Sequence, residues 1–254
     1  KKYLSGPVGT RYHFNQTLQG QVYTSDDGGK TWTWRVKFPF CHARLFRSGE
    51  TLYLLGHRGN VMVMKSTDGG RSWENKGIFI EDLDPRLILK PHNTSNTFAG
   101  GVGDPSAVAD GDYLYLFYGE YGYPGEYKED TYSAEKEWSG QCISVARIAL
   151  SDLDDPQGKA KRWDGNDFTV PYNGIGSPVE SLQIPFGEGG GPASSPGGGF
   201  HWGPSVSWNQ YLNCWVMLMG HVTGSSWRGS KIFISFNTNS DFSDPRSTQE
   251  WSSP

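Results

Sequence analysis

Two stretches of this sequence repeat one pattern: YTSDDGGKTW at residues 23–32 and MKSTDGGRSW at residues 64–73. Both read Ser-x-Asp-x-Gly-x-Thr/Ser-Trp. The aspartate carboxylate can accept backbone N–H bonds across a tight turn, and glycine can adopt φ > 0 there. The tryptophan can then cover the hairpin with a large apolar face. Each stretch therefore predicts a strand, a tight turn and a second strand.

The repeat resembles the Asp-box of sialidases and related β-propellers, whose blades recur at about 40 residues. The resemblance implies a structural role on the outer hairpin of a blade, away from the axis. The residues concerned are Ser25, Asp27, Gly29, Trp32, Ser66, Asp68, Gly70 and Trp73. Two later segments, 143–163 and 232–251, look like eroded copies, each with a strand, an acidic turn containing proline, and a tryptophan.

The composition agrees with many short strands. The 254 residues include 34 Gly, 15 Pro and 36 aromatic side chains (10 Trp, 13 Tyr and 13 Phe). Glycine and proline disfavour helices and aromatics favour half-buried strands, which excludes a helix bundle and argues against disorder. The net charge of −4 without a Lys/Arg cluster predicts no nucleic-acid partner. Every apolar run is shorter than the ~18 residues of a membrane helix, so no membrane segment is expected.

An inner pair of strands precedes each later outer hairpin. The expected pairs are 43–46 with 51–56, 106–109 with 113–118, and 205–208 with 214–220. The sequence therefore predicts an all-β fold, a single β-propeller domain over residues 1–254 with four-stranded antiparallel blades. Its divisions are a half blade 1–40, a blade 41–80, a blade 100–170 with insertion 121–140, an insertion 165–200 and a blade 201–254. Since a propeller closes to remove its sheet edges, this count predicts an incomplete ring, a fragment of a five-bladed protein.

A second resemblance rests on Asp104 to Gly119, which read DPSAVADGDYLYLFYG after Gly103. Gly-Asp-Pro-Ser-x-Val followed by this strand is similar to the inner strands of five-bladed glycoside hydrolases of the arabinanase, xylosidase and invertase type. The resemblance implies that Asp104 is a catalytic or pKa-tuning carboxylate. In that family a later Glu-Gly-Pro-Ser supplies the general acid, whereas here Trp202 stands before Gly203-Pro204-Ser205. The acid must therefore come from elsewhere, or the chemistry differs.

Glycoside hydrolysis needs two carboxyl groups across the scissile bond. We expect Asp104 to act as base or nucleophile and Glu180 or Glu120 to act as the acid. For each carboxylate the alternative is a turn-capping or solvated role. The candidate substrate-binding residues, near blade tops or inner strand starts, are His42, Arg44, Arg58, Tyr121, His201, Trp202, His221 and Trp227. The sugar, its linkage and the stereochemical outcome stay open.

The leading functional hypothesis is a glycoside hydrolase acting on a poly- or oligosaccharide. One alternative is a sialidase-like hydrolase, in which the resemblance implies that Arg44, Arg58 and Arg228 bind a sugar carboxylate, or a lyase of uronic-acid polymers. Another is a non-catalytic propeller that binds carbohydrate or assists assembly, which the replacement by Trp202 favours.

The sequence predicts no cofactor, since its glycine runs lack the context of a phosphate loop. No metal site is predicted, although the acidic turn 152–155 leaves a structural Ca²⁺ open. Cys41, Cys142 and Cys214 are too few and too scattered for a disulfide framework, and their redox state is open. No signal peptide is visible at Lys1; a secreted or periplasmic location is the expectation, and the oligomeric state is open.

Overall fold

The computed structural model describes residues 2–7, 20–38, 40–81, 102–120, 142–184, 200–222 and 231–254. Strands and short 3-10 turns make up its regular structure in these ranges, and all strand pairs are antiparallel. The predicted all-β class is confirmed. No helix in these ranges is long and apolar enough to span a membrane.

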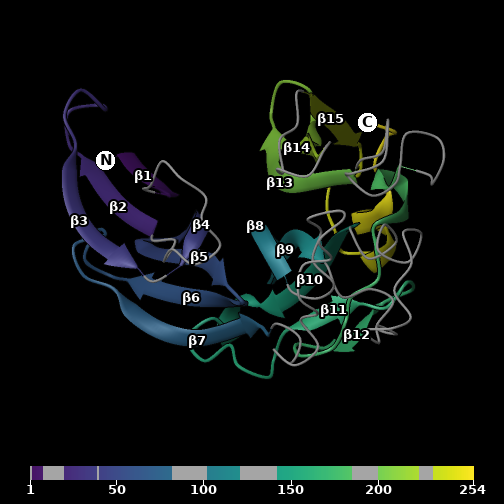
Figure 1. The fold of residues 1–254 in the computed structure, drawn as a ribbon, viewed down its shortest axis with the longest axis horizontal. Coiled ribbons are helices and arrows are strands. Elements are labelled where there is room, and N and C mark those ends of the chain that lie inside the picture. The colour runs from purple at the N-terminus through teal and green to yellow at the C-terminus, as the bar shows by residue number, and fades with distance from the viewer. Residues whose placement is uncertain are drawn as a thin grey trace, which may run out of the picture.

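Four sheets follow one another along the chain and lie side by side in an open arc (Figure 1). Sheet 1 consists of β1 (Lys2–Pro7), β2 (Gly20–Ser25) and β3 (Thr33–Phe38). Sheet 2 consists of β4 (Cys41–Ser48), β5 (Thr51–Arg58), β6 (Asn60–Ser66) and β7 (Glu74–Ile80). Sheet 3 consists of β8 (Val102–Asp110), β9 (Tyr113–Glu120), β10 (Cys142–Ala149), β11 (Lys161–Trp163) and β12 (Phe168–Pro171). Sheet 4 consists of β13 (Phe200–Asn209), β14 (Cys214–Val222) and β15 (Ile232–Asn237).

The arrangement is that of propeller blades. The first strand of each sheet packs against the first strand of the next, β4 against β8 and β8 against β13. The three inner strand pairs expected from the sequence are present as β4–β5, β8–β9 and β13–β14. The described sheets form an open arc rather than a closed ring (Figure 1).

Among the described residues the sheets hold three, four, five and three strands, compared with the four per blade expected from the sequence. Residues 1–40, expected as a half blade, contribute the three described strands of sheet 1. Ser25 ends β2 and Ser66 ends β6, each just before a copy of the repeated turn. Strands β1 to β3 therefore correspond to the second, third and fourth strands of sheet 2.

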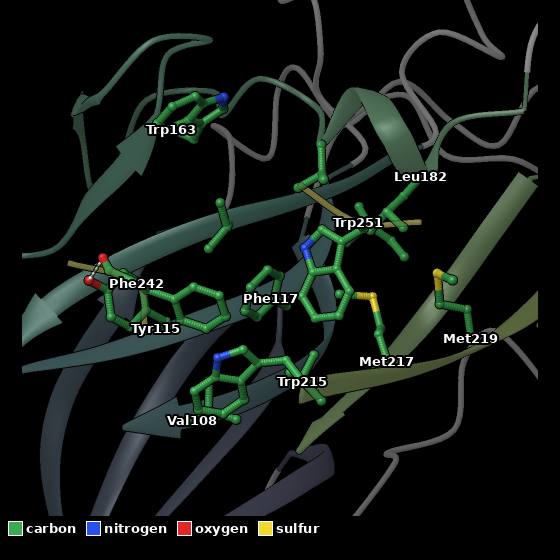
Figure 2. Packing of buried hydrophobic residues seen from close by; sticks show 14 of the residues in the cluster. Val108, Tyr115, Phe117, Trp163, Leu182, Trp215, Met217, Met219, Phe242 and Trp251 are labelled. Carbon is green, nitrogen blue, oxygen red and sulfur yellow. Dashed lines mark hydrogen bonds between the residues drawn. The ribbon is translucent and has the colours of Figure 1, made fainter. Parts of the chain in front are cut away.

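Three apolar clusters fill the interfaces between successive sheets. Between sheets 3 and 4, the side chains of Phe117, Trp215 and Met217 meet in a buried layer (Figure 2). Trp251, from the segment after β15, completes this layer, with its ring perpendicular to that of Phe117 at a centroid distance of 5.6 Å. Aliphatic and aromatic strand residues thus hold the blades together by face-to-face burial.

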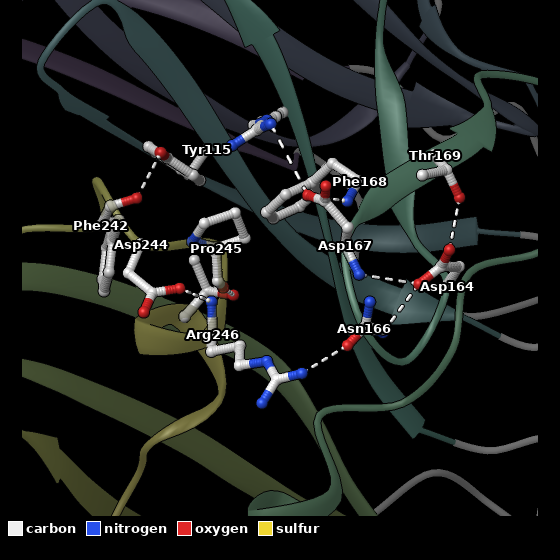
Figure 3. A network of polar contacts seen from close by, with 12 residues as sticks. Tyr115, Asp164, Asn166, Asp167, Phe168, Thr169, Phe242, Asp244, Pro245 and Arg246 are labelled. Atoms are coloured by element: carbon white, nitrogen blue, oxygen red, sulfur yellow. Dashed lines mark hydrogen bonds and ion pairs between the residues drawn. The ribbon is translucent and has the colours of Figure 1, made fainter.

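The segment after β15 is tied to sheet 3 by polar contacts (Figure 3). Tyr115 donates its hydroxyl to the carbonyl of Phe242 at 2.8 Å, and the Phe242 amide donates to Asp110 at 2.7 Å. From η4 (Pro245–Gln249), the Arg246 guanidinium donates to Asn166 at 2.6 Å. This chain segment therefore closes one side of the interface between sheets 3 and 4.

The outward face of sheet 4 is apolar and open. Counted from the bulge in each first strand, Phe117, Val145 and Ile143 of sheet 3 correspond to three aliphatic residues of sheet 4. The three sheet 3 side chains are at most 2% exposed. Their counterparts in sheet 4 are Leu218 (44% exposed), Ile234 (44%) and Ile232 (79%). In a closed propeller this is the face that a following blade covers.

Candidate functional site

The starts of the first strands gather at one end of the arc. Cys41 pairs with His57, Gly103 with Gly119 and Trp202 with Gly220, so each first strand begins where the second strand ends. Because β4, β8 and β13 pack in succession, residues at these ends of sheets 2, 3 and 4 face a common region. We call this end the site end of the arc.

Each of these three first strands carries a bulge next to its start. The pairing register shifts between Cys41 and Arg44, between Gly103 and Ser106, and between Trp202 and Ser205. The displaced residues are therefore 42–43, 104–105 and 203–204. Bulges redirect side chains and are frequent beside active sites.

Asp104 and Gly203 occupy the same position of two bulges and share one backbone conformation. Their φ angles are +47° and +59°. Glycine adopts this region freely, whereas a residue with a Cβ adopts it at a cost that Asp and Asn tolerate best. Sheet 3 thus places a carboxylate where sheet 4 has only glycine, and Asp104 is largely buried there.

His57 lies beside Asp104 and comes from the neighbouring sheet. Its Nε2 atom is 3.7 Å from Oδ1 of Asp104, and the two side chains are 18% and 9% exposed. Sequence reasoning missed this residue. The available signal was the position of His57 directly after the expected strand 51–56, at the end of β5 that pairs with the start of β4.

Glu120 has a structural position that does not suit the acid role considered from the sequence. It is fully buried, and Oε2 accepts hydrogen bonds from Arg162 Nη1 at 2.9 Å, Tyr118 at 3.2 Å and the Gly176 amide at 3.1 Å. Arg162 also donates to the carbonyls of Tyr172 and Glu81. The ion pair therefore joins sheet 3 to the end of sheet 2.

The residues around the Glu120–Arg162 ion pair pack closely and supply hydrogen-bond donors to Glu120. Gly176 packs so closely that a Cβ would lie 2.5 Å from Ser144 Oγ and 2.6 Å from the Tyr118 hydroxyl. Burial raises the pKa of Tyr118 above its ordinary value, so the phenol stays protonated and donates to Glu120. Burial likewise raises the pKa of the Cys142 thiol, and both Cys142 and Cys214 are buried free thiols.

Glu180 lies exposed in η3 (Glu180–Leu182), a short turn held between two sheets. On one side the Val179 amide donates to the carbonyl of Ile143, near the start of β10. On the other side the carbonyl of Leu182 accepts from His201 Nδ1 at 2.7 Å. Glu180 therefore belongs to the site end of the arc, where it is accessible to solvent.

His201 and His221 form a cross-strand pair at the start of β13, packed on Phe233. Burial lowers the pKa of both imidazoles. His201 donates from Nδ1 to Leu182, so the neutral ring carries its lone pair on Nε2, which is buried and has no hydrogen-bond partner among the described residues. This inward orientation differs from the substrate-donor role expected for His201.

For the other candidate residues the structure gives few contacts or none. The Trp202 indole lies against the backbone of Gly220, where a Cβ would approach Nε1 to 2.7 Å. Arg44 is half-buried on β4. Tyr121, Trp227 and Arg228, and the side chains of His42 and Arg58, lie outside the described residues.

The repeated turn adopts the same hydrogen-bond network in both copies. In the second, Asp68 Oδ1 accepts from the amides of Arg71 and Ser72, each at 2.9 Å, and Oδ2 accepts the Ser72 hydroxyl at 2.6 Å. Trp73 Nε1 donates to the carbonyl of Gly70 at 3.1 Å. Each of these bonds has an equivalent in the first copy around Asp27. The motif residues thus stabilise the outer hairpins, away from the site end.

The Asp68 carboxylate makes the stability of the folded protein depend on pH in the acidic range. The Ser72 hydroxyl foremost, with backbone amides, holds the pKa of this carboxylate well below its ordinary value of 3.8. A depressed folded-state pKa contributes stability that is complete above the unfolded value and is lost as pH falls through the folded one. In urea titrations at pH 6 and pH 3, we therefore expect Asp68→Asn to lose less stability on acidification than the wild-type protein. Equal losses in both proteins would contradict this role.

The described residues contain no group of three or more His, Cys, Asp or Glu side chains able to hold a metal. In the acidic turn considered for Ca²⁺, Lys159 Nζ lies 3.4 Å from Asp152 and 3.2 Å from Asp155. Asp154 pairs with Lys65 Nζ at 2.6 Å. Lysines thus balance the three carboxylates of this turn.

The fold and the site end define a protein of the β-propeller class, built from successive antiparallel sheets around an open arc. No family model matches the chain. Two curated fungal proteins are similar to part of it. The "Vacuolar protein sorting/targeting protein 10" of Aspergillus clavatus is 28% identical over 104 residues, 41% of this chain and 7% of that protein. The "Probable oligoxyloglucan-reducing end-specific xyloglucanase" of Neosartorya fischeri is 27% identical over 113 residues, 41% of this chain and 14% of that protein.

Several solved structures are also distantly similar to this chain. A mutant α-L-arabinofuranosidase from Fusarium graminearum has a TM-score of 0.49 at 12% identity, covering 93% of this chain and 62% of that one. An α-L-arabinanase from Penicillium chrysogenum scores 0.47 at 14% identity, covering 88% and 55%. A sialidase from Trypanosoma rangeli scores 0.43 at 13% identity, covering 85% and 27%. All three TM-scores lie below 0.5, so these similarities carry no argument about the function of this chain.

Proposed function

We propose that this protein is a glycoside hydrolase acting on a poly- or oligosaccharide at the site end of the arc. Asp104 carries the proposal. Its carboxylate is held in a bulge at a positive φ, where the equivalent position of sheet 4 is Gly203. Backbone strain at a non-glycine residue persists where the surroundings enforce it, and it concentrates at functional sites. A carboxylate kept in such a position is a candidate base or nucleophile.

Glu180 is the proposed acid. It is the sequence-selected carboxyl group that lies exposed at the site end, since Glu120 is engaged by Arg162. In the proposed reaction Glu180 gives its proton to the leaving oxygen. Asp104 either takes the proton of the attacking water, or attacks the anomeric carbon to form a glycosyl ester that a water deprotonated by Glu180 then hydrolyses. Both routes use the two carboxyl groups and need no cofactor.

The test is a screen of the purified protein against arabinan, xylan, xyloglucan oligosaccharides and sialosides, read by release of reducing ends. Xyloglucan is included because one curated relative is named a xyloglucanase. We expect hydrolysis of at least one neutral substrate. A uronate lyase would show new absorbance from an unsaturated product, and release of sialic acid alone would indicate the sialidase-like alternative. Either result would overturn the proposed assignment.

Glu180→Gln is expected to lower kcat/KM by about 10²–10⁴-fold, the usual contribution of a general acid. An aryl glycoside whose leaving group needs no protonation should lose much less. Glu50→Gln is the matched control, because Glu50 is an exposed glutamate in the β4–β5 turn, at the opposite end of the sheet. Equal losses on both substrates would remove Glu180 from the acid role.

A non-catalytic carbohydrate-binding propeller is the second candidate. The observation that favours it is Trp202, whose indole is seated on Gly220 beside the bulge and can present an aromatic face to a sugar ring. Measurable oligosaccharide binding, abolished by Trp202→Ala and accompanied by no product from any polymer, would establish this candidate over the hydrolase.

A further inference from the structure

We infer that His57 is a positioning residue for Asp104, so that the site is assembled across the interface between sheets 2 and 3. The inference rests on the proposed function, and it adds a residue that the sequence did not select. Its basis is the contact between His57 Nε2 and Asp104 Oδ1 at 3.7 Å, made by residues of two different sheets. The strands that carry them, β5 and β8, pack against each other.

The end of β5 is held firmly enough for His57 to position a partner. The Phe40 ring lies against Gly56, the residue before His57, so closely that a Cβ on Gly56 would come within 2.2 Å of the ring. Phe40 is itself buried and stacked on Phe38 at a centroid distance of 5.0 Å. This aromatic stack fixes the backbone from which the imidazole projects.

Asp104 is held on its own side by the chain. Its φ is +47°, and the following Pro105 restricts the backbone further. Rotation of the short side chain then decides where the carboxylate oxygens lie. The approach of His57 Nε2 from the adjacent sheet, 3.7 Å from Oδ1, is one of the contacts that set this direction.

The distance of 3.7 Å between His57 Nε2 and Asp104 Oδ1 is too short for His57 to be the catalytic acid that works with Asp104. A catalytic acid and its partner carboxylate are separated by about 5 Å in retaining glycosidases and by about 6.5–9.5 Å in inverting ones. A glycosidic oxygen and an attacking water do not fit between groups that are 3.7 Å apart. His57 therefore acts on Asp104, and Glu180 remains the proposed proton donor.

The first test needs no substrate. In imidazole NMR spectra of the ¹⁵N-labelled protein, Asp104→Asn should shift the His57 signals and leave those of His221 in place. His221 is the internal control because it packs on His201 and Phe233 in sheet 4. If the His57 signals do not move, the inference is overturned, whatever the activity of the protein.

The second test uses the best substrate from the screen. His57→Phe keeps the ring shape without a donor, and it should lower kcat by about 10²-fold with KM changed less than threefold, as expected for a misplaced catalytic group. His57→Gln, whose amide can reach the former Nε2 position, should restore at least a tenth of the wild-type kcat. Wild-type kcat in His57→Phe would overturn the inference.

The two proposals fail in different ways. If the wild-type protein hydrolyses no substrate, the proposed function fails, while the NMR shift still decides whether His57 and Asp104 act on each other. If hydrolysis is found and the His57 variants are fully active, the positioning role fails and the hydrolase stands.

Discussion

Asp104→Gly is expected to abolish hydrolysis while leaving the thermal stability unchanged or raised. The φ of +47° costs a residue with a Cβ about 1–2 kcal/mol, and glycine removes that cost, as Gly203 does at the equivalent position of sheet 4. Loss of the base or nucleophile should reduce kcat/KM by about 10³-fold or more. The measurements are steady-state kinetics on the screened substrate and the melting temperature.

Asp104→Asn is the matched control for shape. Asparagine also tolerates a positive φ, so the fold and the volume of the side chain are kept while the charge is lost. It should be as inactive as Asp104→Gly. If Asp104→Gly were instead destabilised and active, Asp104 would be a turn-capping residue, which is the structural alternative that the sequence left open.

Arg162→Met is expected to be the most destabilising single change considered. Arg162 and Glu120 are each 1% exposed in their side chains, and removing the cation leaves a buried carboxylate without its charge partner. Such a loss typically costs about 3–5 kcal/mol of unfolding free energy. The carbonyls of Tyr172 and Glu81 lose their guanidinium donor at the same time. Urea unfolding followed by fluorescence measures the effect.

The double variant Glu120→Gln/Arg162→Met is the control. Glutamine keeps the oxygen that accepts from Tyr118 and Gly176 but carries no charge, so a part of the lost stability should return. If the single Arg162→Met variant lost less than about 1 kcal/mol of unfolding free energy relative to the wild-type protein, other groups would be stabilising the buried Glu120 carboxylate in place of Arg162.

Local patterns in the sequence were sufficient for the elements and for the repeated turn. Alternating apolar residues bounded by turn residues predicted the inner pairs β4–β5, β8–β9 and β13–β14, which the structure confirms. The exposed hairpin turns around Asp27 and Asp68 follow from contacts within eight residues of sequence. Within the described residues sheet 3 also contains β12, and β15 is the last described strand of sheet 4; short motifs do not specify these pairings.

The same distinction holds for the candidate site: a residue in a local pattern could be predicted, whereas contacts between distant parts of the chain could not. Asp104 was selected because Gly-Asp-Pro-Ser is a local pattern, and the structure places it in the β8 bulge. The pairing of Glu120 with Arg162 joins residues 42 positions apart and was not visible from either sequence context. His57 was missed for the same reason, because it meets Asp104 only where two sheets pack.

The sequence by itself determined the all-β class, the positions of most strands, the outer turns and the choice of Asp104 as a candidate carboxylate. These features depend on backbone preferences and on hydrogen bonds between near neighbours in the chain. Only the tertiary structure decided which polar groups are buried and paired, joining Glu120 to Arg162 and bringing His57 to Asp104. Packing of one sheet against the next fixes those distances, and the energy of a charge depends on its surroundings in space rather than on its neighbours in sequence.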